Sequence, residues 1–324
     1  MAATTSHAAS MKRMASFMFT AIVVCIALSV TVLAASFVAA PQALARAPIA
    51  FPLWEQDAGV CHIWSVTNGP SSARPLTTGA VIDLAPAWSP SRTTVAFLRS
   101  TSRDPYDQSS RILMLMDSDG SDQRQLTYEG PTLASGTSVL AYSRDGRYLA
   151  GGCFLSQPNH RAVVLLDLKT RRSRIIQRFD SEGDILSLSW SPDSRQLLVS
   201  VEYGGGAGGW RIDVPRRRVV NRYQDMTGSL SWRPDGKYIL CTRFDYPGKP
   251  LFTELRRPDG ALVKTLGREQ NDSTYSPDGR AYAFVSLSSV GYGSTLKCAA
   301  GDGSHIQTVF KASADQYIYP PAWQ

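Results

Sequence analysis

Short stretches of alternating apolar and polar residues recur along most of this chain. In the stretch Tyr238–Cys241, Tyr238 and Leu240 lie on one face of an extended strand, and Ile239 and Cys241 lie on the other. Clusters of Gly, Pro, Asp and Ser separate the stretches, as is typical of turns between strands. The pattern predicts an all-β protein built from many short strands.

The alternating stretches belong to an internal repeat. Five segments share an aromatic residue, then a turn, then an alternating stretch: PAWSPSRTTVAFL from Pro86, LAYSRDGRYLAG from Leu140, LSWSPDSRQLLV from Leu188, LSWRPDGKYILC from Leu230 and STYSPDGRAYAF from Ser273. Their aromatic residues are Trp88, Tyr142, Trp190, Trp232 and Tyr275, and Trp323 in the C-terminal PPAWQ occupies the same place. The successive spacings of 54, 48, 42, 43 and 48 residues are close to the length of one propeller blade.

Each repeat contains two turn motifs that separate its strands. In SPDG, proline fixes φ at the second turn position, Asp accepts local hydrogen bonds and Gly closes the turn. A second turn follows, for example MDSDGSDQ from Met116 or IDVPRRRV from Ile212, and it joins a third strand to a fourth. Four strands in a period of this length predict one blade of a β-propeller.

The two chain ends together supply one more blade. Ile49-Ala50-Phe51 matches a second strand and His62–Val66 a third, so the N-terminal repeat lacks its first strand. The C-terminal PPAW supplies that strand, and the composite blade closes the ring without exposed sheet edges. The sequence therefore predicts a six-bladed β-propeller closed by the C-terminal strand joining the N-terminal blade.

These repeats resemble those of the TolB-type propellers, a WD-like, PD-repeat family whose blade reads WSPDG…IAF…DADG…LT. The resemblance extends from Pro48 to Gln324. It implies the six-bladed fold, and its motif is specific for fold rather than for activity.

The N-terminal segment has a different composition. Lys12 and Arg13 precede a run from Met14 to Ala40 without a charge, which is long enough for a hydrophobic helix that crosses a bilayer, since about 20 residues suffice. Ala43-Leu44-Ala45 has the small-x-small pattern of a signal-peptide cleavage site. Residues 1–45 are therefore either a signal peptide or a retained membrane anchor that associates with a membrane through residues 14–40. Both interpretations export the propeller, residues 46–324, to the periplasm or the extracellular space.

Composition narrows the classes of function. The formal net charge is +7, which is too diffuse to indicate nucleic-acid binding, and no nucleic-acid-binding motif occurs. Asp117, Asp119 and Asp122 lack the distant Glu of a calcium loop, so DSDGSD is interpreted as a turn. No GxSxG nucleophile motif occurs, and the histidines lie in different blades. We expect no cofactor, no metal and no catalytic residues.

One face of the ring should carry the connections between second and third strands. These connections are rich in aromatic and polar residues, which suit a peptide or sugar ligand because flat rings supply contact area at low entropy cost. The alternative is that each aromatic residue only covers its own hairpin. The candidate ligand-binding residues are Trp54, Glu55, Asp57, Arg103, Asp104, Tyr106, Asp107, Asn159, His160, Tyr203, Asp245, Tyr246, Lys249 and Tyr292.

The opposite face should be basic. First-to-second and third-to-fourth turns project from the same end of a propeller, and several of these turns are rich in arginine. The expected basic face comprises Arg171, Arg172, Arg216, Arg217 and Arg218.

The sequence favours an extracytoplasmic binding or scaffold module that recognises a protein, peptide or carbohydrate through one face. The alternative is a propeller enzyme, a lyase or glycosidase, that acts on a polysaccharide at the pore mouth. It needs paired carboxylates, for which Asp104, Asp107 and Glu55 are the candidates. A third interpretation is the sensory domain of a membrane-anchored signalling protein.

Overall fold

The computed structural model of the chain describes residues 47–67, 69–104, 107–135, 139–155, 160–180, 183–203, 206–243, 252–287 and 294–323. Compact units span Met1–Ala43 and Leu44–Gln324, and every strand lies in the second. The expected hydrophobic helix and the boundary between residues 45 and 46 fall outside the described residues. Among the residues that are described, no helix has the length and apolar character that a membrane crossing requires.

The strands form six antiparallel sheets, which we number as blades in chain order from the innermost strand outward. Blade 1 contains β24 (Gln316–Ile318) and β25 (Ala322–Trp323), then β1 (Ile49–Glu55), β2 (Val60–Val66) and β3 (Arg74–Pro75). Blade 2 contains β4 (Asp83–Trp88), β5 (Thr94–Ser100), β6 (Arg111–Asp117) and β7 (Arg124–Gln125). Blade 3 contains β8 (Leu140–Tyr142), β9 (Tyr148–Phe154), β10 (His160–Asp167) and β11 (Arg172–Asp180).

The remaining blades repeat the same order. Blade 4 contains β12 (Ile185–Trp190), β13 (Gln196–Tyr203), β14 (Gly206–Asp213) and β15 (Arg218–Tyr223). Blade 5 contains β16 (Leu230–Trp232), β17 (Ile239–Arg243), β18 (Phe252–Arg256) and β19 (Leu262–Arg268). Blade 6 contains β20 (Asn271–Tyr275), β21 (Ala281–Leu287), β22 (Ser294–Ala300) and β23 (Gln307–Lys311). Two short 3-10 turns, η1 (Pro70–Ser72) and η2 (Gln108–Ser110), lie in connections.

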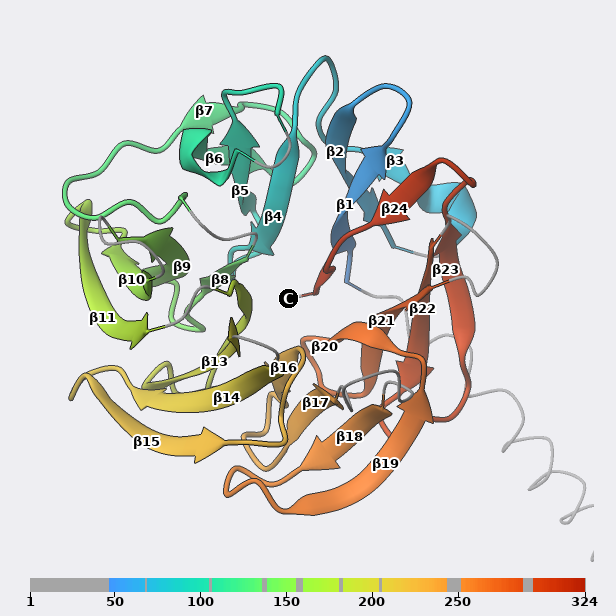
Figure 1. The fold of residues 1–324 in the computed structure, drawn as a ribbon. Helices are drawn as coiled ribbons and strands as arrows, with labels where there is room; N and C mark the ends of the chain where they lie inside the picture. The colour runs from blue at the N-terminus through green and yellow to red at the C-terminus, as the bar shows by residue number, and fades with distance from the viewer. Residues whose placement is uncertain are drawn as a thin grey trace, which may run out of the picture. The chain divides into compact units, whose positions relative to one another are not determined.

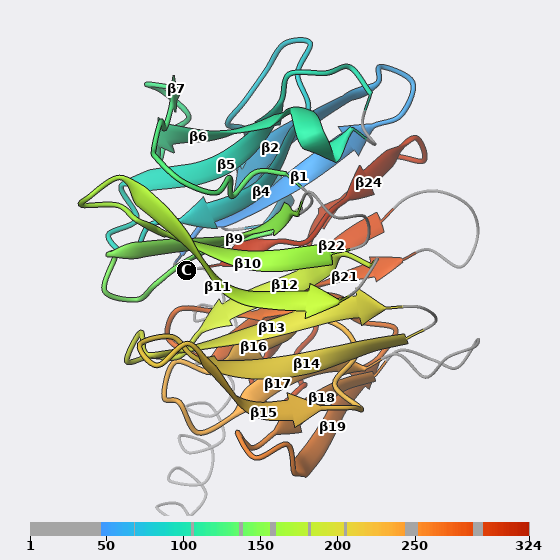
Figure 2. The ribbon, with the colours of Figure 1, turned by 60° about the vertical axis from the view of Figure 1, so that its left-hand side comes forward.

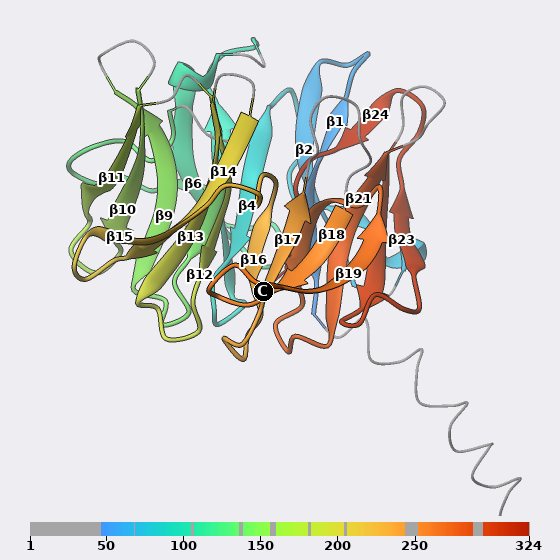
Figure 3. The same cartoon turned by 60° about the horizontal axis from the view of Figure 1, so that its bottom comes forward.

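The six sheets surround a central channel, as Figure 1 shows, so the predicted all-β six-bladed propeller is confirmed. The strands run approximately along the channel, and Figure 2 shows the sheets from the side. We call the end with the first-to-second and third-to-fourth turns the hairpin end, and the other the loop end. Figure 3 shows the β12–β13 turn and the β1–β2 turn at these opposite ends.

The C-terminal strand closes the ring in the predicted blade. In β25, Trp323 pairs with Ile49 and Ala322 with Ala50. The closure is longer than the predicted PPAW, because β24 also pairs with β1, from Leu53 to Glu55. Tyr319–Pro321 separate the two short strands, where two prolines lack the N–H that a ladder requires.

The tight first-to-second turns keep one geometry despite sequence departures. Gly146, Gly236 and Gly279 close these turns at φ of 72°, 72° and 68°. Arg92 and Ser194, which replace this glycine, adopt φ of 60° and 56°, and each donates its N–H to the carbonyl three residues earlier, as the glycines do. The left-handed conformation is therefore imposed by the hairpin and is tolerated by non-glycine residues at a local cost of about 1–2 kcal/mol.

The repeated aromatic residues lie in the core between adjacent blades. Trp88, Tyr142, Trp190, Trp232, Tyr275 and Trp323 are each at most 4% exposed. The Trp190 indole N–H donates to the Ala141 carbonyl of the preceding blade at 3.1 Å. The repeat thus places one large buried ring at every blade junction. Four cysteines, Cys61, Cys153, Cys241 and Cys298, are buried free thiols.

Serines of the innermost strands link blades 4, 5 and 6. The hydroxyls of Ser187 and Ser189 accept the backbone N–H groups of Leu230 and Trp232, both at 2.9 Å. One blade further, Ser229 and Ser231 accept from Ser273 and Tyr275. These bonds satisfy inward backbone donors that have no partner within their own sheet, and they fix the height of one blade against the next.

Candidate functional site

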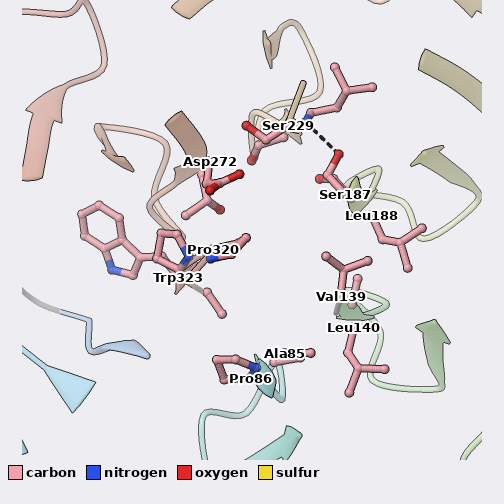
Figure 4. A pocket seen from close by; sticks show the side chains of 18 of the residues that line it. Ala85, Pro86, Val139, Leu140, Ser187, Leu188, Ser229, Asp272, Pro320 and Trp323 are labelled. Carbon is pink, nitrogen blue, oxygen red and sulfur yellow. Dashed lines mark hydrogen bonds between the residues drawn. The ribbon is translucent and has the colours of Figure 1, made fainter. Parts of the chain in front are cut away.

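The innermost strands line a cavity of about 130 Å³ along the ring axis. Three positions before the repeated aromatic residue, each blade contributes one residue to a single level of this channel; the six residues are Ala85, Val139, Ser187, Ser229, Asp272 and Pro320 (Figure 4). An engineered cavity of about 150 Å³ holds one benzene molecule. The channel is therefore large enough for one inserted side chain and too narrow for a folded element.

Asp272 is the one acidic residue among those that line this cavity. It adopts φ of 50° at an irregularity in the β20–β21 pairing, a conformation that Asp tolerates better than most residues. Its carboxylate forms no hydrogen bond or ion pair with a described residue, and burial raises its pKa to about 6. Ser229 and Pro320 flank it on the channel wall, Ser187 lies beyond Ser229, and Ala85 and Val139 complete this level with apolar side chains (Figure 4).

Asp272→Asn is expected to stabilise the protein at neutral pH. The folded-state pKa of about 6 lies above the ordinary value of 3.8, so ionising Asp272 opposes folding. This penalty is absent below pH 4, grows between pH 4 and 6, and is complete above pH 6, where it amounts to about 1–3 kcal/mol. Urea unfolding at pH 4 and pH 7.5 measures this penalty. The increase in unfolding free energy that Asp272→Asn produces should be larger at pH 7.5 than at pH 4.

Asp302→Asn, in a turn of the same blade, is the matched control. The Ser304 hydroxyl donates to Asp302 and lowers its pKa, so ionised Asp302 contributes stability that is lost as pH falls. This variant should lose stability at pH 7.5. A gain for Asp272→Asn that is equal at both pH values would show that the carboxylate ionises freely in the channel.

Two buried arginines lie at the loop end of neighbouring blades. Arg111 begins β6, and Arg161 stands at the equivalent position of β10; they are 7% and 8% exposed. Arg161 stacks on the Phe154 ring at 3.7 Å and forms an ion pair of 3.4 Å with Asp184, at the entry to blade 4. Burial lowers the pKa of Arg111, while Asp184, Tyr319 and Asp107 oppose this shift electrostatically.

Tyr319 exposes an aromatic ring at the same opening. It precedes Pro320 on the innermost path of blade 1, and its N–H donates to Pro52. Its exposed fraction is 41%, and an innermost position meets solvent only through the channel or its opening. We define the mouth cluster as Asp107, Arg111, Arg161, Asp184 and Tyr319. It combines charges of both signs with an exposed ring, which suits recognition of a polar polymer or protein segment.

The described candidate residues of blades 1 and 2 differ in their burial and in their contacts. Trp54 is partly buried and packs against the apolar cluster between blades 1, 2 and 3. Glu55 contacts His62 at 3.3 Å, and the other His62 ring nitrogen lies 2.8 Å from the Gly79 carbonyl. Asp107 accepts from Ser109 at the start of η2.

Other candidates are exposed or lie outside the described residues. Asp57, Arg103 and Asp104 are exposed at the loop end, and His160 pairs with Asp180 at 3.0 Å. Tyr203 ends β13, and its side chain is outside the described part. The residues that fall wholly outside the described ranges are Tyr106, Asn159, Asp245, Tyr246, Lys249 and Tyr292.

The five arginines of the expected basic face are all exposed at the hairpin end, in the third-to-fourth turns of blades 3 and 4. Arg172 pairs with Glu129 and Arg216 with Asp213. Arg171, Arg217 and Arg218 form no ion pair with a described residue.

Sequence reasoning missed Asp272, Arg111, Arg161, Asp184 and Tyr319. All except Tyr319 stand at or just before the start of a strand, where the repeat has no aromatic or turn motif. The sequence offered one clue, since Arg111 and Arg161 precede Asp117 and Asp167, the turn residues of their repeats, by the same spacing. Within the described ranges, no three metal-binding side chains come together.

Comparisons with known proteins point to the TolB propellers. No family model matches the chain. The Tol-Pal system protein TolB of Anaeromyxobacter dehalogenans (strain 2CP-C) is 32% identical over 126 residues, which is 36% of this chain and 27% of that protein. The Tol-Pal system protein TolB of Gluconobacter oxydans (strain 621H) is 27% identical over 267 residues, 67% of this chain and 55% of that protein. The chain thus spans about half or less of these relatives.

The fold gives the same result. The crystal structure of TolB from Acinetobacter baumannii superimposes with a TM-score of 0.68 over 86% of this chain and 66% of that chain, at 17% sequence identity. At this identity the superposition establishes the fold alone. Together with the sequence relatives, it confirms the expected resemblance to TolB-type six-bladed propellers.

Proposed function

We propose that this TolB-like propeller is an exported, non-catalytic scaffold that binds a partner protein at its loop end. The observation that carries the proposal is the mouth cluster, in which two buried arginines interact with Asp184 and the exposed Tyr319 ring at the loop end of the ring. The TolB relatives, which are named as Tol-Pal system proteins, support a protein rather than a sugar as the ligand.

The partner contributes an extended segment rather than a folded element. One side chain of this segment enters the channel, and its neighbours lie over Tyr319. A basic side chain beside Asp272 fits best, because the Asp272 carboxylate has no partner in the described protein and its own level of the cavity is otherwise serine and apolar side chains; Arg144 is the one basic residue that lines the cavity, and it belongs to another level. An ammonium or guanidinium group near Asp272 would favour its ionised form and offset the cost of its burial.

The enzyme alternative receives no support from the carboxylates that it requires. Glu55 is engaged by His62, and Asp107 accepts hydrogen bonds from the backbone and hydroxyl of Ser109. Both carboxylates are engaged in local contacts, and the third candidate, Asp104, is exposed at the loop end. We therefore retain the scaffold as the proposed function.

The proposed location is the periplasm or another extracytoplasmic space, which the TolB relatives and the N-terminal sequence support. Residues 1–45 either direct export and are removed or remain as an anchor. Identification of the mature N-terminus by mass spectrometry distinguishes them: a first residue of Arg46 identifies a signal peptide.

Photo-crosslinking in cells tests the binding face. A benzophenone amino acid replaces Tyr319 at the mouth or, as matched control, Thr170 in an exposed hairpin-end turn. We expect a discrete protein adduct from position 319 that position 170 does not give, because only the former lies within the proposed interface. The same adduct from both positions, or none from position 319, would contradict binding at the loop end.

A further inference from the structure

Unpaired positive charge is concentrated at the hairpin end of blades 3 and 4. Exposed arginines occupy the turns and strand starts there, and we call five of them the arginine sector: Arg171, Arg174, Arg195, Arg217 and Arg218. None forms an ion pair with a described residue. Blades 3 and 4 are neighbours in the ring, so the five guanidinium groups belong to one side of the hairpin end.

The acids of these turns are already engaged. Asp167 pairs with Arg147 at 3.1 Å, and Asp213 pairs with Arg216 at 2.8 Å. Asp193 accepts from the Ser191 hydroxyl and the Arg195 N–H. The five arginines of the arginine sector therefore carry positive charge that no ion pair with a described acid neutralises, and such a surface attracts external anions.

Two sector arginines occupy strained backbone positions. Gly120, Gly260 and Gly303 close the third-to-fourth turns of blades 2, 5 and 6 in the left-handed conformation. Arg171 and Arg217 take this conformation in blades 3 and 4, at φ of 57° and 49°. A bulky residue there costs conformational energy that glycine would avoid, so the local geometry alone does not account for arginine at these two positions.

Exposed aliphatic side chains lie at the same end of the ring. Leu262 and Val263 begin β19 in blade 5, and Ile306 precedes β23 in blade 6; they are 50%, 44% and 53% exposed. Because both strands follow third-to-fourth turns, all three residues lie at the hairpin end. The hairpin end thus combines the arginine sector of blades 3 and 4 with three exposed aliphatic side chains in blades 5 and 6, where Asp259, Lys264 and Asp302 are exposed as well.

The N-terminal part of the chain joins the ring at this end as well. Ile49 pairs with Trp323, and the Trp323 indole N–H donates to the Ala47 carbonyl at 3.0 Å. These contacts fix the start of β1 at the hairpin end.

We propose that the hairpin end docks on an anionic phospholipid surface. The arginine sector binds lipid phosphates, which match the planar donor fork of arginine, and Leu262, Val263 and Ile306 enter the boundary between headgroups and acyl chains. The three exposed aliphatic side chains favour lipid over nucleic acid, because a nucleic acid offers phosphates without an apolar layer. Docking leaves the loop end directed away from the membrane, and it does not depend on the proposed protein partner.

Vesicle flotation of the propeller, residues 46–324, tests this proposal. The ring is closed by its own strands, so this unit is complete without the N-terminal segment. We expect binding to phosphatidylcholine vesicles that contain phosphatidylglycerol, weak binding to pure phosphatidylcholine, and loss of binding as salt rises. Each basic residue contributes about 1 kcal/mol at the surface, so changing the five sector arginines to Gln should weaken partitioning at least about tenfold.

A charge-matched variant controls for net charge. It changes Arg103, Arg178, Arg222, Arg268 and Lys311, all exposed toward the loop end, to Gln, and it should bind as the parent does. Changing Leu262, Val263 and Ile306 to Ser should weaken the binding that remains at high salt. Equal binding by the sector variant and the parent would overturn the proposal, as would an aliphatic variant that binds like the parent.

Discussion

Deleting Tyr319–Gln324 is expected to cost several kcal/mol of unfolding free energy. The deletion removes β25, its two residue pairs with β1 and the 4%-exposed Trp323 ring. It also removes the indole bond to Ala47 and leaves an open edge on the innermost side of blade 1. Truncating a buried tryptophan to alanine alone costs about 3–5 kcal/mol.

Thermal and urea unfolding measure this loss. In a domain of this size, each kcal/mol shifts Tm by about 2–4 °C, so a fall of roughly 10 °C or more is expected. Trp323→Ala should reproduce most of the loss. Tyr319→Ala is the control, because its exposed ring contributes little to the core. A truncated protein that melts with the parent would show that the C-terminal strand does not close the ring.

Arg256→Leu is expected to be the most damaging single change among the charged residues described here. Arg256 occupies a position that is apolar in every other described blade, and its side chain is 5% exposed. It contacts Glu254 at 2.7 Å, Asp225 at 2.7 Å and the Gly260 carbonyl at 2.9 Å. Without Arg256, the buried Glu254 carboxylate keeps an ion pair with Arg243 at the longer distance of 3.8 Å. Breaking a buried ion pair by removing one partner lowers the free energy of unfolding by about 3–5 kcal/mol.

Two variants make this prediction specific. Arg257→Leu changes the exposed neighbour and should alter stability by no more than about 0.5 kcal/mol. Changing Glu254 and Arg256 together to Met should restore much of the loss, because no unpaired charge remains buried. If Arg256→Leu were as mild as Arg257→Leu in urea unfolding, the ion pair would contribute nothing to folding.

The ring was predictable because its determinants are local and repeated. Trp88, Trp190 and Trp232 recur with the same turn behind them, and each turn forms from its own few residues. Even Arg92 and Ser194, which lack the expected glycine, adopt the same backbone. Closure was predictable because the missing first strand of blade 1 and the spare PPAW complement each other. Its extension into β24 was not, since QYI carries no motif of the repeat.

The candidate site was less predictable because it depends on contacts between blades. Asp272 acquires its raised pKa from the innermost strands of other blades, which no spacing within blade 6 encodes. Trp54 was grouped with the loop-end aromatics, yet its ring packs on the cluster between blades. Arg256 and Glu254 alternate like ordinary strand residues, and only the three-dimensional structure shows that both are buried.

Calorimetric titration of the protein recovered by crosslinking at position 319 tests the central claim most directly. The parent propeller is compared with two variants. The mouth variant combines Tyr319→Ala with Arg103→Ala, a change of an exposed arginine in the β5–β6 connection of the loop end, and the sector variant changes the five sector arginines to Gln. If the loop end binds the partner, the mouth variant binds at least about tenfold more weakly and the sector variant binds as the parent does. The proposed binding face would be contradicted if the mouth variant bound the partner with the affinity of the parent while the sector variant bound it more weakly.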